Sequence, residues 1–450
     1  MFLSPPALRA TRRALVLLCA CASVTLAAPP SAHATPQDIF GFGARTPGMA
    51  MTGASYVDDF EAVFAKPAGL AGARRMALVL GLTGGAYRLR LDGDIMPTDA
   101  SQGMTIGFQL PLPFTDELEN VFVIGAGFFT PTNTVLRNNV LFVDSPQWPV
   151  VDRAQVVALQ MAAGINLDRW VPGLRIGGGV SAMAQNLGRL IVELDPSGDF
   201  ASVTEVQLTT SFSPVLGVQY QRERWALGVT YRGELRTDVA LDVQVNDLPI
   251  ALPALTIDAL AHFDPHTLTA EVSFFPVPSL MLVANLTYRR WSAWTGAPQR
   301  TTEDSFEPPE PRFRDTVSPR IAAEWRTGDE ALSATLRGGF AFDPTPAPRA
   351  GFEPGRDSTG QVRLDPNGRP VLLPVRYLDG HRYVLTAGTG IRWQTRHEPL
   401  VRFDLFAQAQ RIGARTHSIS ADAVSPSDTG PHMRSEGWIL ALGWTGGLEW

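Results

Sequence analysis

Apolar and polar residues alternate with a period of two along much of the chain. From Trp438 to Trp450 every even position is Trp, Leu or Gly, and the odd positions between them are mostly small or polar. A period of two places successive side chains on opposite faces of an extended strand. A lipid-facing strand needs about ten residues to cross the hydrocarbon. This segment is therefore long enough to span a membrane.

The same alternation recurs upstream. Strands are expected at 76–91, 103–112, 120–130, 154–166, 174–193, 204–220, 225–238, 266–275, 280–292, 316–326, 332–342, 383–393, 401–411 and 436–450. An even number of antiparallel strands with this pattern is typical of bacterial outer-membrane barrels. We therefore predict an all-β fold, a transmembrane antiparallel β-barrel of about 14 strands.

The connections between the expected strands alternate in length. The short ones are 111–119, 167–173, 221–224, 276–279, 327–331 and 394–400. The long ones include 132–153, 239–265, 293–315, 342–382 and 412–435. Barrels of this kind have short periplasmic turns and long outer loops. With an even strand count, both ends of the barrel domain, residues 76–450, then lie on the periplasmic side.

Tryptophans lie near the ends of several expected strands: Trp225, Trp291, Trp294, Trp325, Trp393, Trp438 and Trp450. Amphipathic rings favour the headgroup level of a bilayer, so these residues are candidates for aromatic girdles, with ordinary core packing as the alternative. Because the chain stops on an aromatic residue, Trp450 looks like the C-terminal signal read by the barrel-assembly machinery. A chance edge strand is the alternative for this segment.

The first 34 residues have the features of a secretory signal peptide. Three arginines precede an apolar stretch at 14–28, and Ala32–Ala34 forms a small-x-small cleavage site. The residues around Cys19 and Cys21 are alternatively a degenerate lipoprotein box. We expect export to the cell outer membrane of a Gram-negative-type bacterium. Residues 35–75 have no place in the barrel wall, so they are expected to form a hatch that plugs the lumen.

Composition and motifs exclude several other functions. The net charge of −6 offers no basic excess for nucleic acid. The histidines after the signal peptide are scattered without metal-ligand spacing, and no Gly-x-Ser-x-Gly elbow occurs. We therefore expect no enzyme activity, no metal and no cofactor. A hydrolase whose Ser and His meet only in space is the remaining enzymatic alternative.

Residues 38–71 resemble the hatch of the long-chain fatty-acid transporter family (FadL/TodX type). In that family a glycine-rich stretch leads to acidic residues and then to an Asn-Pro-Ala-Gly-Leu motif. The residues here that fit are Gly48, Ala50, Gly53, Ala54, Asp58, Asp59 and the hatch motif Lys66, Pro67, Ala68, Gly69 and Leu70. Lys66 stands where the family has Asn. Residues 127–131, 280–294, 313–316 and 337–346 resemble later signatures in the same order.

The resemblance implies a monomeric barrel that passes hydrophobic molecules sideways into the membrane at a kinked third strand. The candidates for this kink and lateral opening are Gly125, Gly127, Phe128, Phe129 and Pro131. Gly lacks side-chain packing and Pro interrupts a strand ladder, which suits a bend. Plain strand irregularity is the alternative.

Candidate pocket residues come from the hatch and from the inward face of the strands. Phe40, Phe42 and Phe60 are candidates to line a pocket, or else simply fill the lumen. The inward polar candidates are Arg232, Glu271, Asn285, Arg289, Arg337, Arg402 and Asp404. An arginine among them, foremost Arg232, Arg289 or Arg337, could bind a carboxylate head, because a guanidinium matches carboxylate geometry. Pairing with neighbouring acids is the alternative.

Three functions remain open. The first is a passive outer-membrane transporter for hydrophobic compounds such as long-chain fatty acids or aromatic hydrocarbons. The second is a structural barrel that holds a partner protein, and the third is a general porin for polar solutes. A hatch argues against the porin, because a plug blocks an open water channel. The expected partners are outer-membrane lipid and hydrophobic small molecules, with the assembly machinery during biogenesis.

Overall fold

The computed structural model describes residues 36–98, 100–132, 136–137, 148, 150–151, 155–194, 200–246, 255–294, 311–349, 351–356, 361–375, 377–394, 399–418 and 432–450. The predicted signal peptide, residues 1–34, lies outside the described residues. Among the described residues, no helix is both long enough and apolar enough to cross a membrane.

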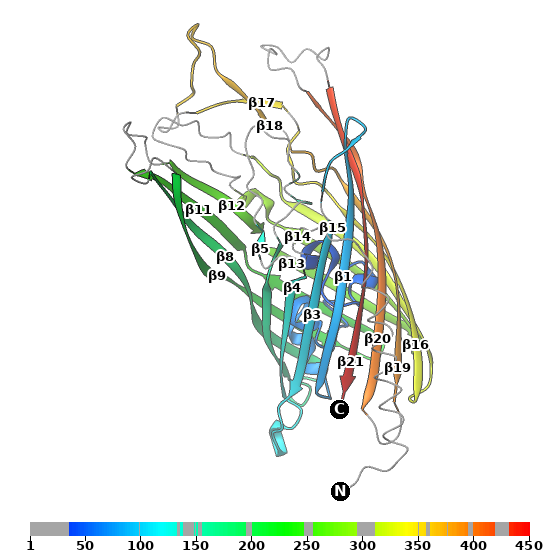
Figure 1. The fold of residues 1–450 in the computed structure, drawn as a ribbon. Helices are drawn as coiled ribbons and strands as arrows, with labels where there is room; N and C mark the ends of the chain where they lie inside the picture. The colour runs from blue at the N-terminus through cyan, green and yellow to red at the C-terminus, as the bar shows by residue number, and fades with distance from the viewer. Residues whose placement is uncertain are drawn as a thin grey trace.

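Fourteen strands of the described chain form a closed antiparallel wall (Figure 1). They are β1 (Ala77–Leu91), β3 (Ser101–Pro111), β4 (Phe122–Pro131), β7 (Ala158–Asn166), β8 (Leu174–Leu194), β9 (Phe200–Gln221), β10 (Trp225–Arg232), β13 (Thr267–Val277), β14 (Leu280–Arg289), β15 (Thr316–Gly328), β16 (Leu332–Asp343), β19 (Arg382–Trp393), β20 (Leu400–Ser418) and β21 (His432–Glu449). The last strand pairs with the first along the whole of β1, and Met76 and Trp450 exchange two further backbone hydrogen bonds. The barrel expected from the alternation is confirmed.

Seven other strands of the described chain lie outside this wall. They are β2 (Asp94–Ile95), β5 (Leu136–Arg137), β6 (Gln155–Val156), β11 (Leu235–Asn246), β12 (Leu255–Asp264), β17 (Gly351–Pro354) and β18 (Leu372–Val375). The short connections of the wall lie at the same end as the C-terminus, whereas β11, β12, β17 and β18 lie toward the opposite end (Figure 1). The length alternation of the connections therefore correctly separates the two ends of the barrel.

Two expected strands are wrong in extent: the strand predicted at 401–411 continues to Ser418, and the strand predicted at 225–238 is too long. A single strand was predicted at 225–238, but β10 ends at Arg232 and the chain leaves the wall. The next partner on β9 is Pro214, which has no N–H, so the ladder cannot continue beyond the bond from Gly233 N to Pro214 O. The following strand, β11, pairs with β12 and runs parallel to the upper part of β8.

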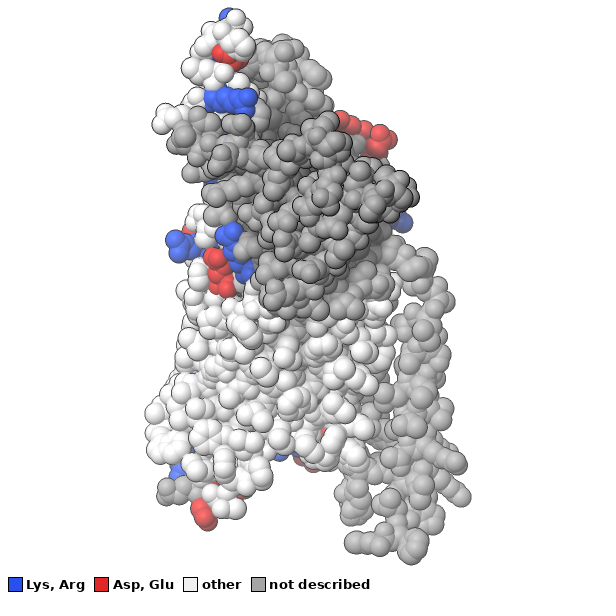
Figure 2. Space-filling view, turned by 60° about the vertical axis from the view of Figure 1, so that its left-hand side comes forward, with Lys and Arg blue, Asp and Glu red and all other residues white. Residues whose placement is uncertain are grey.

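The outward face of the wall is apolar. Large side chains such as Leu227, Ile321 and Leu385 are 44%, 60% and 64% exposed. On the face shown in Figure 2, a broad band of the described surface carries no Lys, Arg, Asp or Glu, and charged residues lie above and below it. A continuous exposed apolar belt of this kind is the surface that a lipid-embedded barrel needs.

Two of the tryptophans assigned to girdles are elsewhere. Trp225, Trp325 and Trp450 are exposed near strand ends, as girdle residues should be, and Trp438 is exposed within β21, which begins at His432, but Trp291 and Trp294 are buried. Their short helix η4 (Trp291–Ala293) follows β14, and both rings pack against Phe313 in an aromatic cluster. Core packing, the alternative for these residues, is what the structure shows.

Residues 36–75, which we call the hatch, lie inside the barrel (Figure 1). They form four short helices, α2 (Pro36–Phe40), η1 (Pro47–Met49), α3 (Ala62–Ala65) and η2 (Pro67–Gly72); a further one, η3 (Asp116–Leu118), lies in the turn between β3 and β4. Most hatch side chains are buried. The hatch therefore uses the lumen of the barrel as its hydrophobic core.

Glycines on the inward face of the wall make room for the hatch. The rings of Phe40, Phe42 and Phe60 occupy the space that a side chain would need at the facing wall residues Gly85, Gly127 and Gly107. A Cβ on Gly228 would lie 1.5 Å from the carbonyl oxygen of Ala54, so only glycine fits there. The hatch backbone thus packs directly on the strands.

Replacing Ile321 by Arg tests whether the apolar belt faces lipid. Ile321 lies midway between the outward residues Val317 and Trp325 of β15. We expect Ile321→Arg to lower barrel stability by about 2–4 kcal/mol, because a charge would be placed near the bilayer midplane. Denaturant titration in lipid vesicles, followed by the gel shift between folded and unfolded forms, measures this loss. Leu364→Arg is the control, since Leu364 is 56% exposed but lies beyond the wall; equal losses in both variants would contradict the assignment.

Candidate functional site

Wall side chains donate hydrogen bonds to carbonyl groups of the hatch backbone. The donors are Gln219 to Ser55 at 2.5 Å, Arg320 to Ala50 at 2.9 Å, Gln408 to Phe40 and Pro47 at 2.9 Å, Gln410 to Ile39 at 3.1 Å and Thr386 to Gly48 at 3.0 Å. The hatch has little regular structure, so many of its backbone groups lack a local partner. A buried carbonyl without a hydrogen bond is costly, and these side chains remove that cost.

Glu271 on β13 fixes the middle of the hatch. Its carboxylate accepts hydrogen bonds from the backbone N–H groups of Gly53 and Ser55, at 2.9 and 2.8 Å, and from the Ser55 hydroxyl at 2.7 Å. Asn285 on β14 donates a fourth bond at 2.7 Å. A carboxylate with four donors is well satisfied in a buried site. Both wall residues were expected to face inward, and both do.

Glu61 performs the same task within the hatch. Its side chain is fully buried and accepts three hydrogen bonds of 2.8 Å from the backbone N–H groups of Ala44, Arg45 and Thr46. Burial and the neighbouring Asp59 raise the pKa of Glu61 to about 7, although the N–H donors favour its charged form. The turn that precedes η1 is therefore held from inside the hatch.

A chain of ion pairs joins the hatch to the wall at the end near the C-terminus. Arg45 donates to both oxygens of Glu324 at 2.9 Å, and Glu324 also accepts from Arg337 at 2.8 Å. Asp404 then joins Arg337 to Arg402, with both bonds at 2.5 Å. The chain returns to the hatch where Arg402 donates to Asp59. Each buried charge in it has an opposite partner, which burial requires.

Lys66 of the hatch motif contacts the wall without a polar partner. It is fully buried, and its Nζ has no hydrogen-bond partner. Its side chain passes within contact of the positions that a Cβ would occupy on Gly69 and Gly217. Burial lowers the pKa of Lys66 to about 7, with Glu271 the strongest opposing influence. The helix that follows, η2, carries the rest of the motif and packs on β7, β8 and β9.

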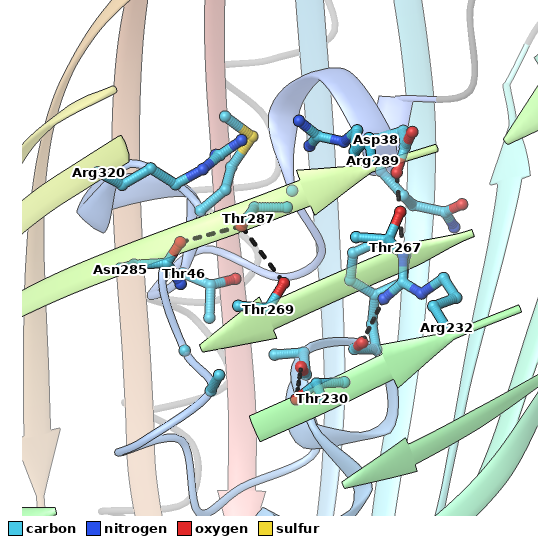
Figure 3. Close-up of a pocket in the computed structure, with 17 residues that line it drawn as sticks. Asp38, Thr46, Thr230, Arg232, Thr267, Thr269, Asn285, Thr287, Arg289 and Arg320 are labelled. Carbon is cyan, nitrogen blue, oxygen red and sulfur yellow. Dashed lines mark hydrogen bonds and ion pairs between the residues drawn. The ribbon is translucent and has the colours of Figure 1, made fainter. Parts of the chain in front are cut away.

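A polar cavity of about 90 Å³ lies between the hatch and strands β10, β13, β14 and β15 (Figure 3). Its cationic lining residues are Arg232, Arg289 and Arg320, and its threonines are Thr46, Thr230, Thr267, Thr269 and Thr287. Met51 and Phe64 of the hatch supply apolar surface. Such a cavity is large enough for several waters or a small polar group.

Some of the cationic capacity around this cavity is unused. Nη2 of Arg232 donates a hydrogen bond to the carbonyl oxygen of Phe64 at 2.5 Å, and Nη2 of Arg320 donates one to Asp343 at 2.9 Å. The Nε atom of each arginine is buried without a hydrogen-bond partner. Nη1 of Arg382, near the adjoining cavity, also lacks one. Protein atoms cover these N–H groups, so they show that the arginines here are not fully hydrogen-bonded rather than marking contacts for a ligand.

Two smaller cavities adjoin the first. One of about 30 Å³ is lined by Arg289, Asp343 and Arg382, and one of about 20 Å³ by Arg232 together with the apolar residues Ala158, Met183 and Leu235. Asp38 of α2 lines all three cavities. The space around α2 is therefore polar on one side and partly apolar toward β7 and β8.

The structure separates the predicted pocket residues into two groups. Arg232 and Arg289 line the cavity, as proposed from the sequence. The structure places Arg337 elsewhere, between Glu324 and Asp404. Phe40, Phe42 and Phe60 are 0%, 1% and 2% exposed and fill space between the hatch and the strands. Filling of the lumen, the alternative for these rings, matches their position.

The third wall strand, β4, contains the candidates for a lateral opening. Within β4, Val123–Pro131 pair with Gly103–Pro111 of β3, and Phe122–Phe129 pair with Ala158–Ile165 of β7. Neither described pairing contains a register shift. Gly125 faces Leu70 and Val63, and Gly127 faces Phe42 and Val63. These glycines therefore make room for hatch side chains in this structure.

Sequence reasoning did not single out several residues that hold the site together. They are Glu61 in the hatch and Gln219, Arg320, Glu324, Asp343, Thr386, Gln408 and Gln410 in the wall. All of the wall residues lie on the polar face of an alternating strand, which was a usable signal. Their partners could not be read from the sequence, because the partners belong to the irregular backbone of the hatch.

Solved structures of known proteins share this fold. A crystal structure of a Pseudomonas aeruginosa FadL homologue matches with a TM-score of 0.56 and 16% identity over 94% of this chain and 98% of that chain. The toluene transporter TodX of P. putida matches with a TM-score of 0.52 and 14% identity, over 91% of this chain and 99% of that chain. The toluene transporter TbuX of Ralstonia pickettii matches with a TM-score of 0.51 and 16% identity, over 90% of this chain and 98% of that chain. No family model and no curated protein sequence matched. The likeness confirms the type of barrel expected from the resemblance.

Lys66→Met tests the cost of the buried amine. A neutral Lys66 in the docked hatch becomes charged when the hatch leaves the wall, so the undocked state binds more protons between pH 7 and 10.5. Docking of the wild-type hatch should therefore strengthen as pH rises through this window, by at most about 1.4 kcal/mol per pH unit. Hydrogen exchange of the hatch amides at pH 7.5 and 9, after correction for intrinsic rates, measures this change.

We expect Lys66→Met to remove this pH dependence and to protect the hatch more at pH 7.5. Glu61, with a pKa raised to about 7, still titrates at the lower end of this window and acts in the opposite direction, so the difference between wild type and Lys66→Met, which keeps Glu61, isolates the contribution of Lys66. A wild-type hatch whose stability does not rise between these pH values would contradict the assignment.

Proposed function

We propose that this chain is a passive channel of the outer membrane for hydrophobic compounds, and that its lumenal cavity receives the anionic head of an amphipathic one. The cavity beside the docked hatch, whose charged lining residues are Arg232, Arg289, Arg320 and a single acid, Asp38, is the observation that supports this proposal. A hydrocarbon without a head group would leave this excess of positive charge in the lining unmatched. A carboxylate would offset it and would match guanidinium geometry.

The apolar part of such a molecule also has a path. The smaller cavity at Arg232 continues to Phe64, Met183 and Leu235. Apolar contact favours transfer of a hydrocarbon chain out of water by about 25 cal/mol per Å² buried. We therefore place the head at Arg289 and Arg232 and the chain toward β7 and β8.

The hatch disfavours the general porin. It fills the lumen, and wall side chains hydrogen-bond its backbone on several sides. An open aqueous path for polar solutes would require these bonds to break. Exit through β4 remains part of the proposal, and it requires Val63 and Leu70 of the hatch to move from behind Gly125. The names of the structural relatives, a FadL homologue and toluene transporters, agree with hydrophobic cargo.

Uptake by a strain that lacks the chain tests the proposal. We expect loss of the chain to lower uptake of labelled oleate at limiting concentration, and wild-type protein to restore it. Arg289→Gln should restore oleate uptake several-fold less well, because it removes a guanidinium from the cavity without removing a bond to the hatch backbone. Arg222→Gln is the control, since Arg222 is exposed in a turn at the other end of the barrel.

Two results would contradict the proposal. One is equal oleate uptake with and without the chain. The other is a large, steady conductance of the purified protein in planar bilayers, which a general porin would produce. Reduced toluene uptake with unchanged oleate uptake would retain the channel and overturn the anionic head.

A further inference from the structure

An arginine cluster lies on the outward face of β1, β20 and β21, above the apolar belt. On β1 the even residues face outward, and after Ala86 the next two are Arg88 and Arg90. On β21 the outward residues above Trp438 are Glu436 and Arg434. Arg411 is the corresponding residue of β20. Four arginine side chains therefore lie immediately above the apolar, outward-facing residues of three neighbouring strands.

Strand register brings these side chains together. Trp438 is paired with Arg88 on one side and with Arg411 on the other, and Glu436 is paired with Arg90. Because neighbouring strands lie about 4.8 Å apart, Arg88 and Arg411 are separated by roughly 10 Å across the tryptophan. The Arg411 guanidinium lies over the Trp438 ring, 5.3 Å from its centroid. The cluster is thus small enough for one polar head group.

The cluster carries more positive charge than its acids neutralise. Glu436 accepts from Arg411 at 2.6 Å and from Arg434 at 3.4 Å. Neither Arg88 nor Arg90 has an ion-pair partner among the described residues. Of the nearest other acids, Asp92 accepts from the backbone N–H of Arg434 at 2.6 Å, and Asp94 lies in the same hairpin, above the cluster. Two guanidinium groups therefore remain available next to the belt.

The height of the cluster matches the head groups of one leaflet. The outward tryptophans Trp438 and Trp450 are both exposed and are separated by twelve residues of one strand. Twelve residues rise about 40 Å along a strand, or roughly 30 Å along the membrane normal at the tilt of such barrels. Trp438 and Trp450 therefore mark the two interfaces. The cluster lies above Trp438, in the leaflet far from the C-terminus.

The cluster is local rather than a general feature of the rim. At similar height the outward side chains of β16 and β19 are Phe342 and Tyr383, and the Tyr288 hydroxyl of β14 donates to Asp315. Below the cluster, Leu440 is 48% exposed in the belt. The arginine cluster therefore directly adjoins the apolar belt on these strands.

We propose that Arg88, Arg90, Arg411 and Arg434 bind the phosphate head group of a lipid in the outer leaflet of the outer membrane. A guanidinium presents paired N–H donors that match phosphate oxygens, and anionic lipids concentrate next to basic residues at this level. Glu436 pairs with Arg411 and Arg434 when no lipid is bound, and the head group replaces it. The acyl chains of the lipid lie on Leu440 and Ala86 below, which selects a lipid over free phosphate.

Native mass spectrometry of the full-length protein in nanodiscs of phosphatidylcholine with added lipid A tests the site. We expect wild-type protein to retain lipid A at least ten-fold more tightly than Arg88→Gln/Arg90→Gln/Arg411→Gln. The matched control is Arg169→Gln/Arg222→Gln/Arg224→Gln, which changes three exposed arginines in turns at the opposite end and should bind like wild type. The gel shift between heated and unheated samples confirms that each barrel is folded.

Glu436→Gln provides a second test if the triple variant does not fold. It removes the acid that competes with the head group, so lipid A should bind at least three-fold more tightly. Equal binding by wild type and the triple variant, or no gain in Glu436→Gln, would overturn the proposal. Displacement of the lipid by inorganic phosphate at the concentration of lipid A would indicate a free-anion site and would also overturn it.

Discussion

Every polar backbone group of the hatch must find a partner inside a barrel whose outer face is apolar. The hatch has only short helices, so it cannot satisfy these groups by itself. Wall side chains such as Glu271, Gln408 and Thr386 supply the missing bonds, and wall glycines allow the backbone to come close enough to form them. The position of the hatch therefore depends on the inward face of the strands.

This constraint also determines where a ligand could bind. The ion pairs from Arg45 to Arg402 hold the hatch near the C-terminal end of the barrel, and Glu271 holds its middle. The cavity then opens on the other side of the hatch, where Arg289 and Arg320 line it. The residues that dock the hatch and those that line the cavity share the same strands, so movement of the hatch would change the cavity.

The sequence predicts the barrel well because the hydrophobic effect acts on every strand separately. Each strand must present an apolar residue to lipid at every second position, which leaves a repeated local signal. The strand expected at 225–238 ends early, at Arg232, because the neighbouring strand has Pro214 at the next pairing position. The alternation within 225–238 carries no information about that neighbouring residue. Buried Trp291 and Trp294 show the same limit, because their position depends on Phe313, which lies outside the strand pattern that contains them.

The site was only partly predictable for a related reason. Polar inward residues such as Glu271 and Arg402 can be picked out on the alternating strands, but their partners lie hundreds of residues away in an irregular segment. A disulfide between the hatch and the wall tests the central claim most directly. Ser55 Oγ and Ser273 Oγ are 2.5 Å apart, and the chain has two cysteines, both before the hatch. In membranes, Ser55→Cys/Ser273→Cys should yield one cross-linked peptide, whereas Ser55→Cys/Ser435→Cys should not; free thiols at both positions of the first pair would contradict the docked hatch.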